Sequence, residues 1–316
     1  GGAGYPTVHV TNLKDSGTGS LRAALSAGNR TIVFDVSGTI YVGGSGLYPV
    51  GSNITLDGST APGSGITLTG GPLYWNGNSN FIVRQLRFRN QTLPATADSM
   101  TIKYGAHHFI VDHVSFSGAS DGSLDITEGS HDGTVQWSML GTQDPAHEEH
   151  VSEVGISSNR ITYHHNLFWE GVQRHPQIGD GDHPDGLSHP LSGDVRSNLI
   201  WAPVQGLFGF TGAGQTTSNV VRNYFYMRSD HTGFNYDVHT ETGATAYSSG
   251  NYDRRGGSTA TSFPMSEMSV PSYAVVTMEA TAKLAAQAVL DGAGSRVGGL
   301  DSIDQAKINA IKAAGL

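Results

Sequence analysis

A short strand-like motif recurs along the middle of the chain, and this repeat constrains the fold more than any other feature. The copies run from V-R-Q-L-R-F at 83–88 to V-R-S-N-L-I at 195–200, with others at 111–116, 135–140 and 163–168. Their start positions differ by 28, 24, 28 and 32 residues, and a further copy lies near 221–225. One strand motif in each period of this length is typical of a solenoid, in which each turn packs on its neighbours.

The segments between the copies contain strand-forming residues and little helix signal, which favours a parallel β-helix over a leucine-rich horseshoe. Glycine supplies 43 of the 316 residues and charged residues only 14%, as expected for short strands joined by turns. A β-propeller is the alternative, but it needs about four strands per blade at a period of about 40 to 45. Asn166, Asn198 and Asn223 fall at matching places in the repeat, and we expect them to stack as a ladder.

Both ends of the chain carry helix signals, and a solenoid needs its open ends covered. Ser20 is an N-cap candidate for a short helix at 21–25, which we expect to close one end. Residues 277–290 predict a second helix capped by Thr277, and residues 302–313 predict a third, packed along the coil or at its other end. We therefore expect one all-β domain over residues 1–316, with a C-terminal helical tail at about 277–316.

The charge balance limits the classes of partner. Asp and Glu number 27 against 18 Lys and Arg, which gives a net charge of −9 and argues against a nucleic-acid binder. No apolar run is long enough to span a membrane. Cysteine is absent, so no disulfide contributes to the fold. We expect a monomer with neither a nucleic-acid nor a membrane partner.

Acidic residues are spaced so that the solenoid would bring them together. Asp121, Ser123 and Asp125 alternate, so in an extended segment their side chains leave the same face. Asp98 lies about one repeat earlier, which places it one rung away, about 4.8 Å along the coil axis. Carboxylates gathered in this way repel one another unless a cation lies between them, and hard oxygen ligands suit Ca²⁺. The alternative interpretation is three solvated aspartates in turns.

Several segments together resemble a known family. They are V-T-N-L-K-D-S-G-T-G-S-L-R-A-A-L at 10–25, R-T-I-V-F-D-V-S-G-T-I at 30–40, F-I-V-D-H-V-S-F-S at 109–117, T-Y-H-H-N-L-F at 162–168 and R-H-P at 174–176. Over almost the whole chain the sequence resembles the pectate lyase/pectin lyase group of polysaccharide lyases. The V-D-H strand and the T-Y-H-H-N…R-x-P arrangement are fairly specific to this group. The resemblance implies a single-stranded, right-handed parallel β-helix.

The resemblance also implies a reaction and its residues. Enzymes of this group cleave α-1,4-linked galacturonan by β-elimination and leave 4,5-unsaturated oligogalacturonides. By position, Asp98, Asp121 and Asp125 match the family's Ca²⁺ ligands, and Arg174 matches its proposed base. An arginine base predicts an alkaline activity optimum, since arginine loses its proton only at high pH. The substrate class, acidic plant cell-wall polysaccharide (polygalacturonate or pectin), implies a secreted enzyme.

The sequence departs from the family at positions that would hold substrate carboxylates. The family commonly has a second arginine where this chain has Gly179, and lysines near the places of Thr127 and Ser152. We expect His150, His175 and Arg160 to bind substrate in their place. Other basic residues that could compensate are Arg84, Arg87, Lys103 and His147.

Three other functions remain open at this stage. A pectin lyase would act on methyl-esterified polymer without calcium; the missing lysines favour it, and the aspartates argue against it. An inverting polygalacturonase-type hydrolase would use two of the aspartates as acid and base. A non-catalytic glycan-binding β-helix would bind polysaccharide without turning it over.

Overall fold

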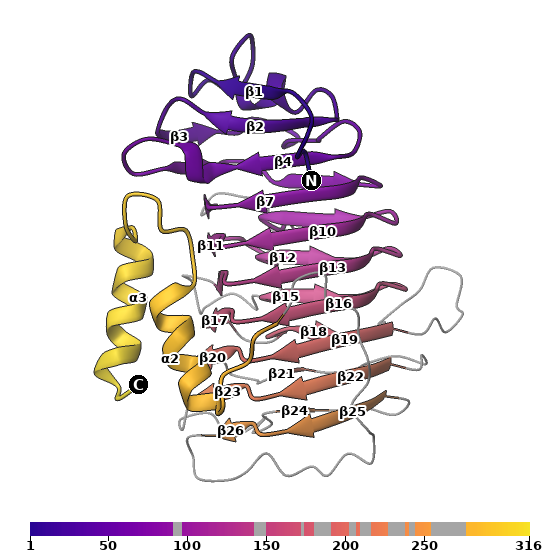
Figure 1. Cartoon of the computed structure of the whole chain (residues 1–316), viewed down its shortest axis with the longest axis vertical. Coiled ribbons are helices and arrows are strands. Elements are labelled where there is room, and N and C mark those ends of the chain that lie inside the picture. The colour runs from indigo at the N-terminus through magenta and orange to yellow at the C-terminus, as the bar shows by residue number, and fades with distance from the viewer. Residues whose placement is uncertain are drawn as a thin grey trace.

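The strands form long parallel sheets stacked along one coil (Figure 1). The computed structural model describes residues 1–90, 97–141, 150–171, 174–179, 191–201, 207–208, 216–226, 238–239, 244–253 and 276–316. Every strand pairing in these ranges is parallel, and each strand pairs with strands of the preceding and following turns of the coil. The prediction of an all-β parallel β-helix is confirmed, and a propeller is excluded.

Sheet A contains β1 Thr7–Val10, β2 Arg30–Phe34, β4 Ile54–Asp57, β7 Ser79–Arg84, β10 His107–Asp112, β13 His131–Gln136, β16 Asn159–His164, β19 Leu191–Arg196, β22 Thr216–Val221 and β25 Ala244–Ser249. Sheet B contains β3 Gly38–Tyr41, β5 Ile66–Thr69, β8 Leu86–Arg89, β11 Ser115–Ser117, β14 Met139–Gly141, β17 Leu167–Trp169, β20 Leu199–Trp201, β23 Tyr224–Tyr226 and β26 Tyr252–Asp253. Sheet C contains β6 Leu73–Asn76, β9 Met100–Lys103, β12 Leu124–Ile126, β15 Ser152–Val154 and β18 Gln177–Ile178. A further pair joins β21 Leu207–Phe208 to β24 Val238–His239, and a 3₁₀ turn, η1, spans Gly58–Thr60.

The repeat seen in the sequence is the rung-to-rung register of sheet A. The first residues of the repeat copies are register partners in order, namely Val83, Val111, Val135, Tyr163 and Val195. The last copy differs, because Val195 pairs with Val220 and not with Val221. The copy predicted near 221–225 is therefore present, and its register begins one residue earlier, at Val220.

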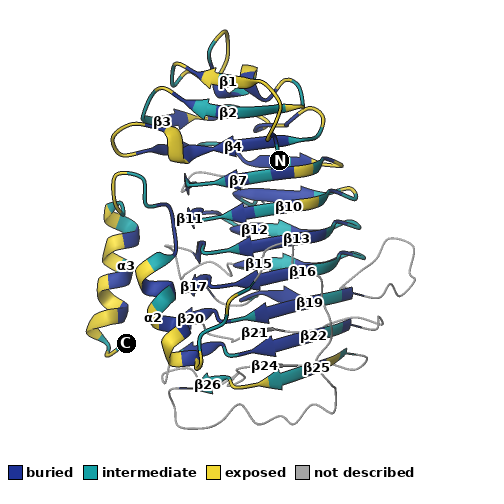
Figure 2. Ribbon diagram, in the orientation of Figure 1, coloured by how far each residue is buried: buried dark blue, intermediate teal, exposed yellow. Residues whose placement is uncertain are grey.

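The interior of the coil is filled by stacked apolar side chains, shown as dark-blue strand faces in Figure 2. Trp75 stacks on Phe81 with ring centroids 4.0 Å apart, and Phe81 stacks on Phe109 at 5.3 Å. Phe88 and Phe116 form a second stack at 5.0 Å on sheet B. In-register parallel strands bring equivalent side chains of successive rungs together, so identical residue types can pack face to face.

The predicted asparagine ladder is confirmed and continues one rung further, to Asn251. The side-chain nitrogen of Asn166 donates to Oδ1 of Asn198 (3.0 Å), Asn198 donates to Asn223 (2.9 Å), and Asn223 donates to Asn251 (3.2 Å). Each accepting oxygen also takes the backbone N–H of the preceding asparagine. The ladder therefore satisfies backbone groups at the turns from sheet A to sheet B, where no strand partner is present.

The helices begin where side-chain caps allow. Helix α1 (Leu21–Ala24) is capped by Ser20 as predicted, and α3 (Ser302–Ala313) matches its predicted bounds. Helix α2 (Ala282–Gly292) starts later than predicted, because the hydroxyl of Thr281 accepts the N–H of Leu284. The prediction of Thr277 as its N-cap is therefore wrong.

Helices α2 and α3 lie along the coil beside sheet B, not at its end (Figure 1). Their buried faces, which include Val289 and Ile308, pack in one apolar cluster with Trp169 and Trp201 of sheet B. Burial of these apolar side chains stabilises the fold, at about 25 cal/mol for each Å² of apolar surface removed from water. The two helices thereby cover the outer side of β14, β17, β20 and β23 of sheet B.

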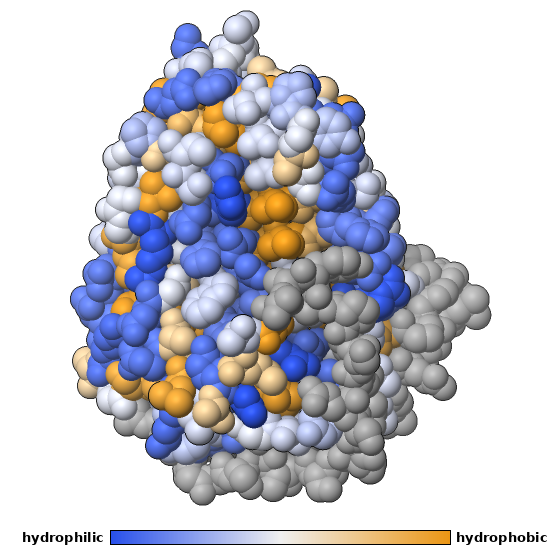
Figure 3. All heavy atoms as spheres, in the orientation of Figure 1, coloured by the Kyte–Doolittle hydropathy of each residue, from blue (hydrophilic) through white to orange (hydrophobic). Residues whose placement is uncertain are grey.

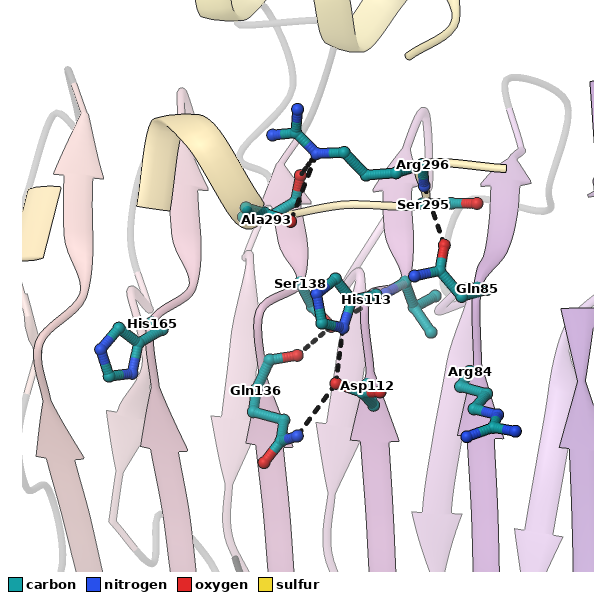
Figure 4. A network of polar contacts seen from close by, with 12 residues as sticks. Arg84, Gln85, Asp112, His113, Gln136, Ser138, His165, Ala293, Ser295 and Arg296 are labelled. Carbon is teal, nitrogen blue, oxygen red and sulfur yellow. Dashed lines mark hydrogen bonds and ion pairs between the residues drawn. The ribbon is translucent and has the colours of Figure 1, made fainter. Parts of the chain in front are cut away.

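The segment that joins the two helices is fixed to the turns between sheets A and B (Figure 4). The Arg296 N–H donates to Oε1 of Gln85 (2.8 Å), and the Ser295 N–H donates to Oγ of Ser115 (2.9 Å). Next to these contacts, Asp112 accepts hydrogen bonds from the ring of His113 (2.7 Å) and the amide of Gln136 (2.9 Å). The polar turns of successive rungs therefore hold the helical tail in place.

The surface that faces the viewer in Figure 1 is largely polar, with an apolar patch over β7 and β10 (Figure 3). Ile82 and Ile110, which are register partners on these strands, are both partly exposed. None of the helices in the described ranges is long and apolar enough to cross a membrane.

We predict that Asn198→Ala lowers the free energy of unfolding by about 2–3 kcal/mol, because it leaves buried donors of Asn166 without an acceptor. Urea denaturation followed by circular dichroism measures the change. Asn309→Ala on the exposed face of α3 is the matched control and should shift stability by less than about 0.5 kcal/mol. Equal effects of the two substitutions would contradict a structural role for the ladder.

Candidate active site

Four acidic side chains come together on and beside sheet C. Asp98 precedes β9 and Asp121 precedes β12, while Asp125 and Glu153 lie within β12 and β15. The strand register pairs Thr101 with Asp125 and Asp125 with Glu153, so these positions form one column across three rungs. On β12, Leu124 and Ile126 are fully buried, so the intervening Asp125 points outward from the coil.

Asp98 and Asp125 form the closest part of this cluster, on either side of Gly122. Oδ1 of Asp98 accepts the N–H of Gly122 and Oδ2 accepts the hydroxyl of Thr101, each at 2.9 Å. A Cβ at Gly122 would lie 2.7 Å from Oδ1 of Asp98 and 2.8 Å from Oδ1 of Asp125. Any side chain at 122 would therefore fill the small space that both carboxylates face.

The electrostatics of this pair reflect crowding of negative charge. Burial, together with the charge of Asp121, raises the pKa of Asp98 to about 7. Burial and the charges of Asp98 and Glu153 raise the pKa of Asp125 well above its usual range, although Oδ1 of Asp125 accepts the Glu153 N–H at 2.9 Å. A positive charge between the two groups would relieve this repulsion.

Asp121 lies at the edge of the cluster and is tied to a predicted substrate-binding residue. Nδ1 of His150 is 3.2 Å from Oδ1 of Asp121, and this hydrogen bond holds the pKa of Asp121 below its usual value. Residues 121–123 are not extended, and the hydroxyl of Ser123 is turned inward to the carbonyl of Gly141. The expectation that Asp121, Ser123 and Asp125 share one face is therefore wrong for Ser123, because the strand begins only at Leu124.

Arg174 reaches the cluster from the next rung through Glu153, a residue that the sequence analysis missed. Nη1 of Arg174 lies 2.7 Å from Oε2 of Glu153, and Gln177, the register partner of Glu153, donates to Oε1 at 3.3 Å. Arg174 adopts a φ of 66°, a conformation that costs free energy for a residue with a side chain. The N–H of Ser152 donates to the backbone carbonyl of Arg174 at 2.9 Å, and this hydrogen bond helps to hold Arg174 in that conformation.

The spacing of the repeat could have revealed Glu153, since it follows Asp125 by one period of 28 residues. The sequence comparison with the family instead drew attention to the lysine absent near Ser152. In the structure Ser152 is buried and its hydroxyl donates to the Leu124 carbonyl, so position 152 faces the interior. The outward position is 153, and there the chain carries a negative charge.

The structure does not bring Arg160 or His175 into the cluster. Arg160 lies on β16 of sheet A, where it forms a two-point ion pair with Asp132. His175 is fully buried, and its Nε2 lies 3.2 Å from the carbonyl oxygen of Glu170. Of the two, neither presents a group to the outer face of sheet C.

Of the other basic residues considered as replacements for the missing arginine and lysines, Arg84 and Arg87 already have partners within the protein. Arg84 forms an ion pair with Asp57, and Arg87 is buried against backbone carbonyls that include Gly299. His147 lies outside the described residues. Lys103, in contrast, lies on β9 of sheet C, two residues after Thr101.

The cluster fits a hard cation in its chemistry more than in its present geometry. Within the described ranges, no group of three or more acidic or histidine side chains is arranged to bind a metal ion. The structure brings together the pair Asp98 and Asp125, with Asp121 beside it, and not the predicted shell of three. Carboxylate oxygens such as those of Asp98 and Asp125 are nevertheless among the ligands that Ca²⁺ prefers.

We predict that Asp98→Asn stabilises the protein at pH 8 in chelator, by about 2–4 kcal/mol, and has little effect at pH 4. The pKa of Asp98 is about 7 in the folded state against 3.8 ordinarily, so the folded state binds more protons between these values. Its contribution to stability therefore falls as pH rises through this window. Denaturation curves at both pH values measure the effect.

Comparison with known proteins places this geometry in context. No protein-family model matches the chain. Over 228 residues, 71% of its length, the chain is 31% identical to "Probable pectate lyase C" of Aspergillus fumigatus, and the match covers 50% of that protein. The chain thus spans about half the length of the curated relatives it matches.

The fold is similar to that of solved structures over nearly the whole chain. The major allergen of cedar pollen, jun a 1, has a TM-score of 0.72 at 18% identity, covering 93% of this chain and 90% of that chain. A pectate lyase from Bacillus sp. N165, solved in complex with trigalacturonate, has a TM-score of 0.66 at 15% identity, covering 93% and 94%. The resemblance to the pectate lyase group is thereby confirmed: the chain is a homologue of curated pectate lyases and has the parallel β-helix fold of the solved ones.

Proposed function

We propose that this chain acts as a calcium-dependent pectate lyase, which cleaves α-1,4-linked polygalacturonate by β-elimination to 4,5-unsaturated oligogalacturonides. The observation that supports this most is the column of carboxylates on sheet C with the guanidinium of Arg174 at its end, in a homologue of curated pectate lyases. We place the substrate, an acidic plant cell-wall polysaccharide, outside the cell, and the enzyme with it.

In this reaction a base removes the C5 proton of a galacturonate unit, and a double bond forms between C4 and C5. The bond from C4 to the glycosidic oxygen breaks, and that oxygen takes up a proton. The negative C6 carboxylate opposes loss of the neighbouring proton, and bound Ca²⁺ would supply the positive charge that offsets it. Asp98 and Asp125 are the residues that would hold this ion, with Asp121 beside them.

Arg174 is the proposed base, and Glu153 sets the condition under which it can act. A guanidinium can accept a proton only after losing one, and in this structure Arg174 is held in an ion pair with the Glu153 carboxylate. Glu153 is also the register partner of Asp125, so its carboxylate would add to the negative charge that holds Ca²⁺ beside Arg174. The buried Nε of Arg174 has no hydrogen-bond partner among the described residues, which leaves a donor for a substrate oxygen.

A second candidate function is an inverting hydrolase, and the separation of pKa values favours it. Asp98 has a pKa of about 7, as a general acid requires, while the pKa of neighbouring Asp121 is lowered, as suits a base. Its products would be new reducing ends without a C4=C5 double bond. The pectin-lyase and glycan-binding alternatives have no comparable support from the described residues.

With polygalacturonate at alkaline pH, we expect Ca²⁺ to produce an ultraviolet absorbance rise from the conjugated product, and chelator to abolish it. Arg174→Ala and Asp125→Ala should each lower kcat/KM at least about 100-fold. Arg22→Ala, at a half-buried ion pair near the N-terminus, is the control and should retain activity. Reducing ends released without absorbance would instead establish the hydrolase, and a rise indifferent to chelator would exclude a calcium requirement.

Glu153→Gln tests the role proposed for Glu153. We expect the substitution to raise the Ca²⁺ concentration for half-maximal activity about 5-fold or more, because it removes one negative charge beside Asp125. The value of kcat at saturating Ca²⁺ should stay within about 3-fold. Calcium titrations of the initial rate measure both quantities. An unchanged calcium requirement together with a large loss of kcat would show that Glu153 acts on Arg174 alone.

A further inference from the structure

We propose that Tyr48, Tyr74 and Lys103 form a subsite that binds one uronate unit of the polysaccharide on the N-terminal side of the carboxylate cluster. The tyrosine rings would carry the apolar face of the sugar, and the lysine would bind its carboxylate. The inference rests on the proposed function, because it takes the polysaccharide to lie along the coil axis over Asp125.

The subsite is a continuation of the column that contains the cluster. Tyr74 on β6 is the register partner of Thr101, which in turn pairs with Asp125. A bridge between Leu47 and Leu73 places Tyr48 one rung beyond Tyr74. Tyr74 therefore lies two rungs, about 10 Å, from Asp125 on the same outer face of sheet C. A polymer that lies along the coil axis over Asp125 would pass over both tyrosines.

The two tyrosines form a ready platform. Their rings are stacked with centroids 4.9 Å apart and planes inclined by 21°. Tyr48 is 46% exposed although it is a large apolar side chain, so the platform is open to a ligand. Burial, with the charges of Tyr48 and Asp98, raises the pKa of the Tyr74 hydroxyl, which indicates that the platform lies close to the acidic cluster. Because the two rings stack on each other, the pair presents its ring edges and the outer face of Tyr48, already ordered before a ligand binds.

Lys103 supplies the charge that distinguishes a uronate from a neutral sugar. Its Nζ lies 5.6 Å from the ring centroid of Tyr74 and 4.7 Å from that of Tyr104. Within the described ranges no carboxylate pairs with it, whereas Arg84 and Arg160 are held by aspartates. In a chain of net charge −9, an unpaired cation beside an open aromatic surface complements an acidic ligand.

The inference is tested with Tyr74→Ala and Lys103→Met, measured on polygalacturonate and on short oligogalacturonates. We expect each substitution to raise KM for the polymer about 10-fold, with kcat within about 2-fold, and to leave the kinetics on oligomers too short to reach the subsite unchanged. Tyr74→Phe and Lys103→Arg should restore most of the affinity. Tyr41→Ala and Lys14→Met, exposed residues of the same types elsewhere, are the matched controls.

Calorimetric titration of the wild type and of each variant with polygalacturonate and with a neutral galactan separates failure of the subsite proposal from failure of the lyase proposal. If the wild type binds polygalacturonate without cleaving it and both variants bind more weakly, the subsite stands and the lyase proposal fails. Cleavage with an unchanged polymer KM in both variants would overturn the subsite, as would equal losses on long and short substrates. A wild type that binds galactan as tightly as polygalacturonate would overturn the assignment of a uronate.

Discussion

The in-register stacking of parallel strands is the constraint on which the rest of this structure depends. Backbone hydrogen bonds fix successive rungs about 4.8 Å apart, so each side chain meets its equivalent one turn earlier and one turn later. Where the equivalents are apolar or can share hydrogen bonds, the contact stabilises the coil. The Phe81–Phe109 stack and the pairing of Asn198 with Asn223 are examples. The same geometry cannot separate like charges that fall in register.

The candidate active site uses this unfavourable side of the repeat. Asp125 and Glu153 are register partners, and Asp98 lies across Gly122 from Asp125. The strand register holds these carboxylates close together, because the backbone positions are fixed by the neighbouring rungs. Arg174 offsets part of this charge through its pair with Glu153, while burial first, and the neighbouring carboxylates second, raise the pKa values of Asp98 and Asp125. A site that stores repulsion in this way favours a bound cation, and pays for it in stability when the cation is absent.

The three sheets have different outer surfaces, and this division locates the chemistry. The outward residues of β17 and β20 on sheet B, such as Trp169 and Leu199, are apolar and pack in one cluster with α2 and α3. The outward column of sheet C carries a tyrosine, then Thr101, then carboxylates, then Gln177. The helical tail therefore covers the face that needs burial. Sheet C keeps the aromatic and charged groups that suit an acidic polysaccharide.

The sequence by itself determined the coil. Its spacing predicted the partners of Val83, Val111 and Val135, and the place of Asp98 one rung from Asp125, because a repeat converts separation along the chain into separation along an axis. Only the tertiary structure decided which way each side chain points. It turned Ser152 and Ser123 inward, and it set Glu153 on Arg174. Near the ends of short strands the alternation of side chains is broken by turns, so a sequence pattern cannot assign the face; the packing of neighbouring rungs does.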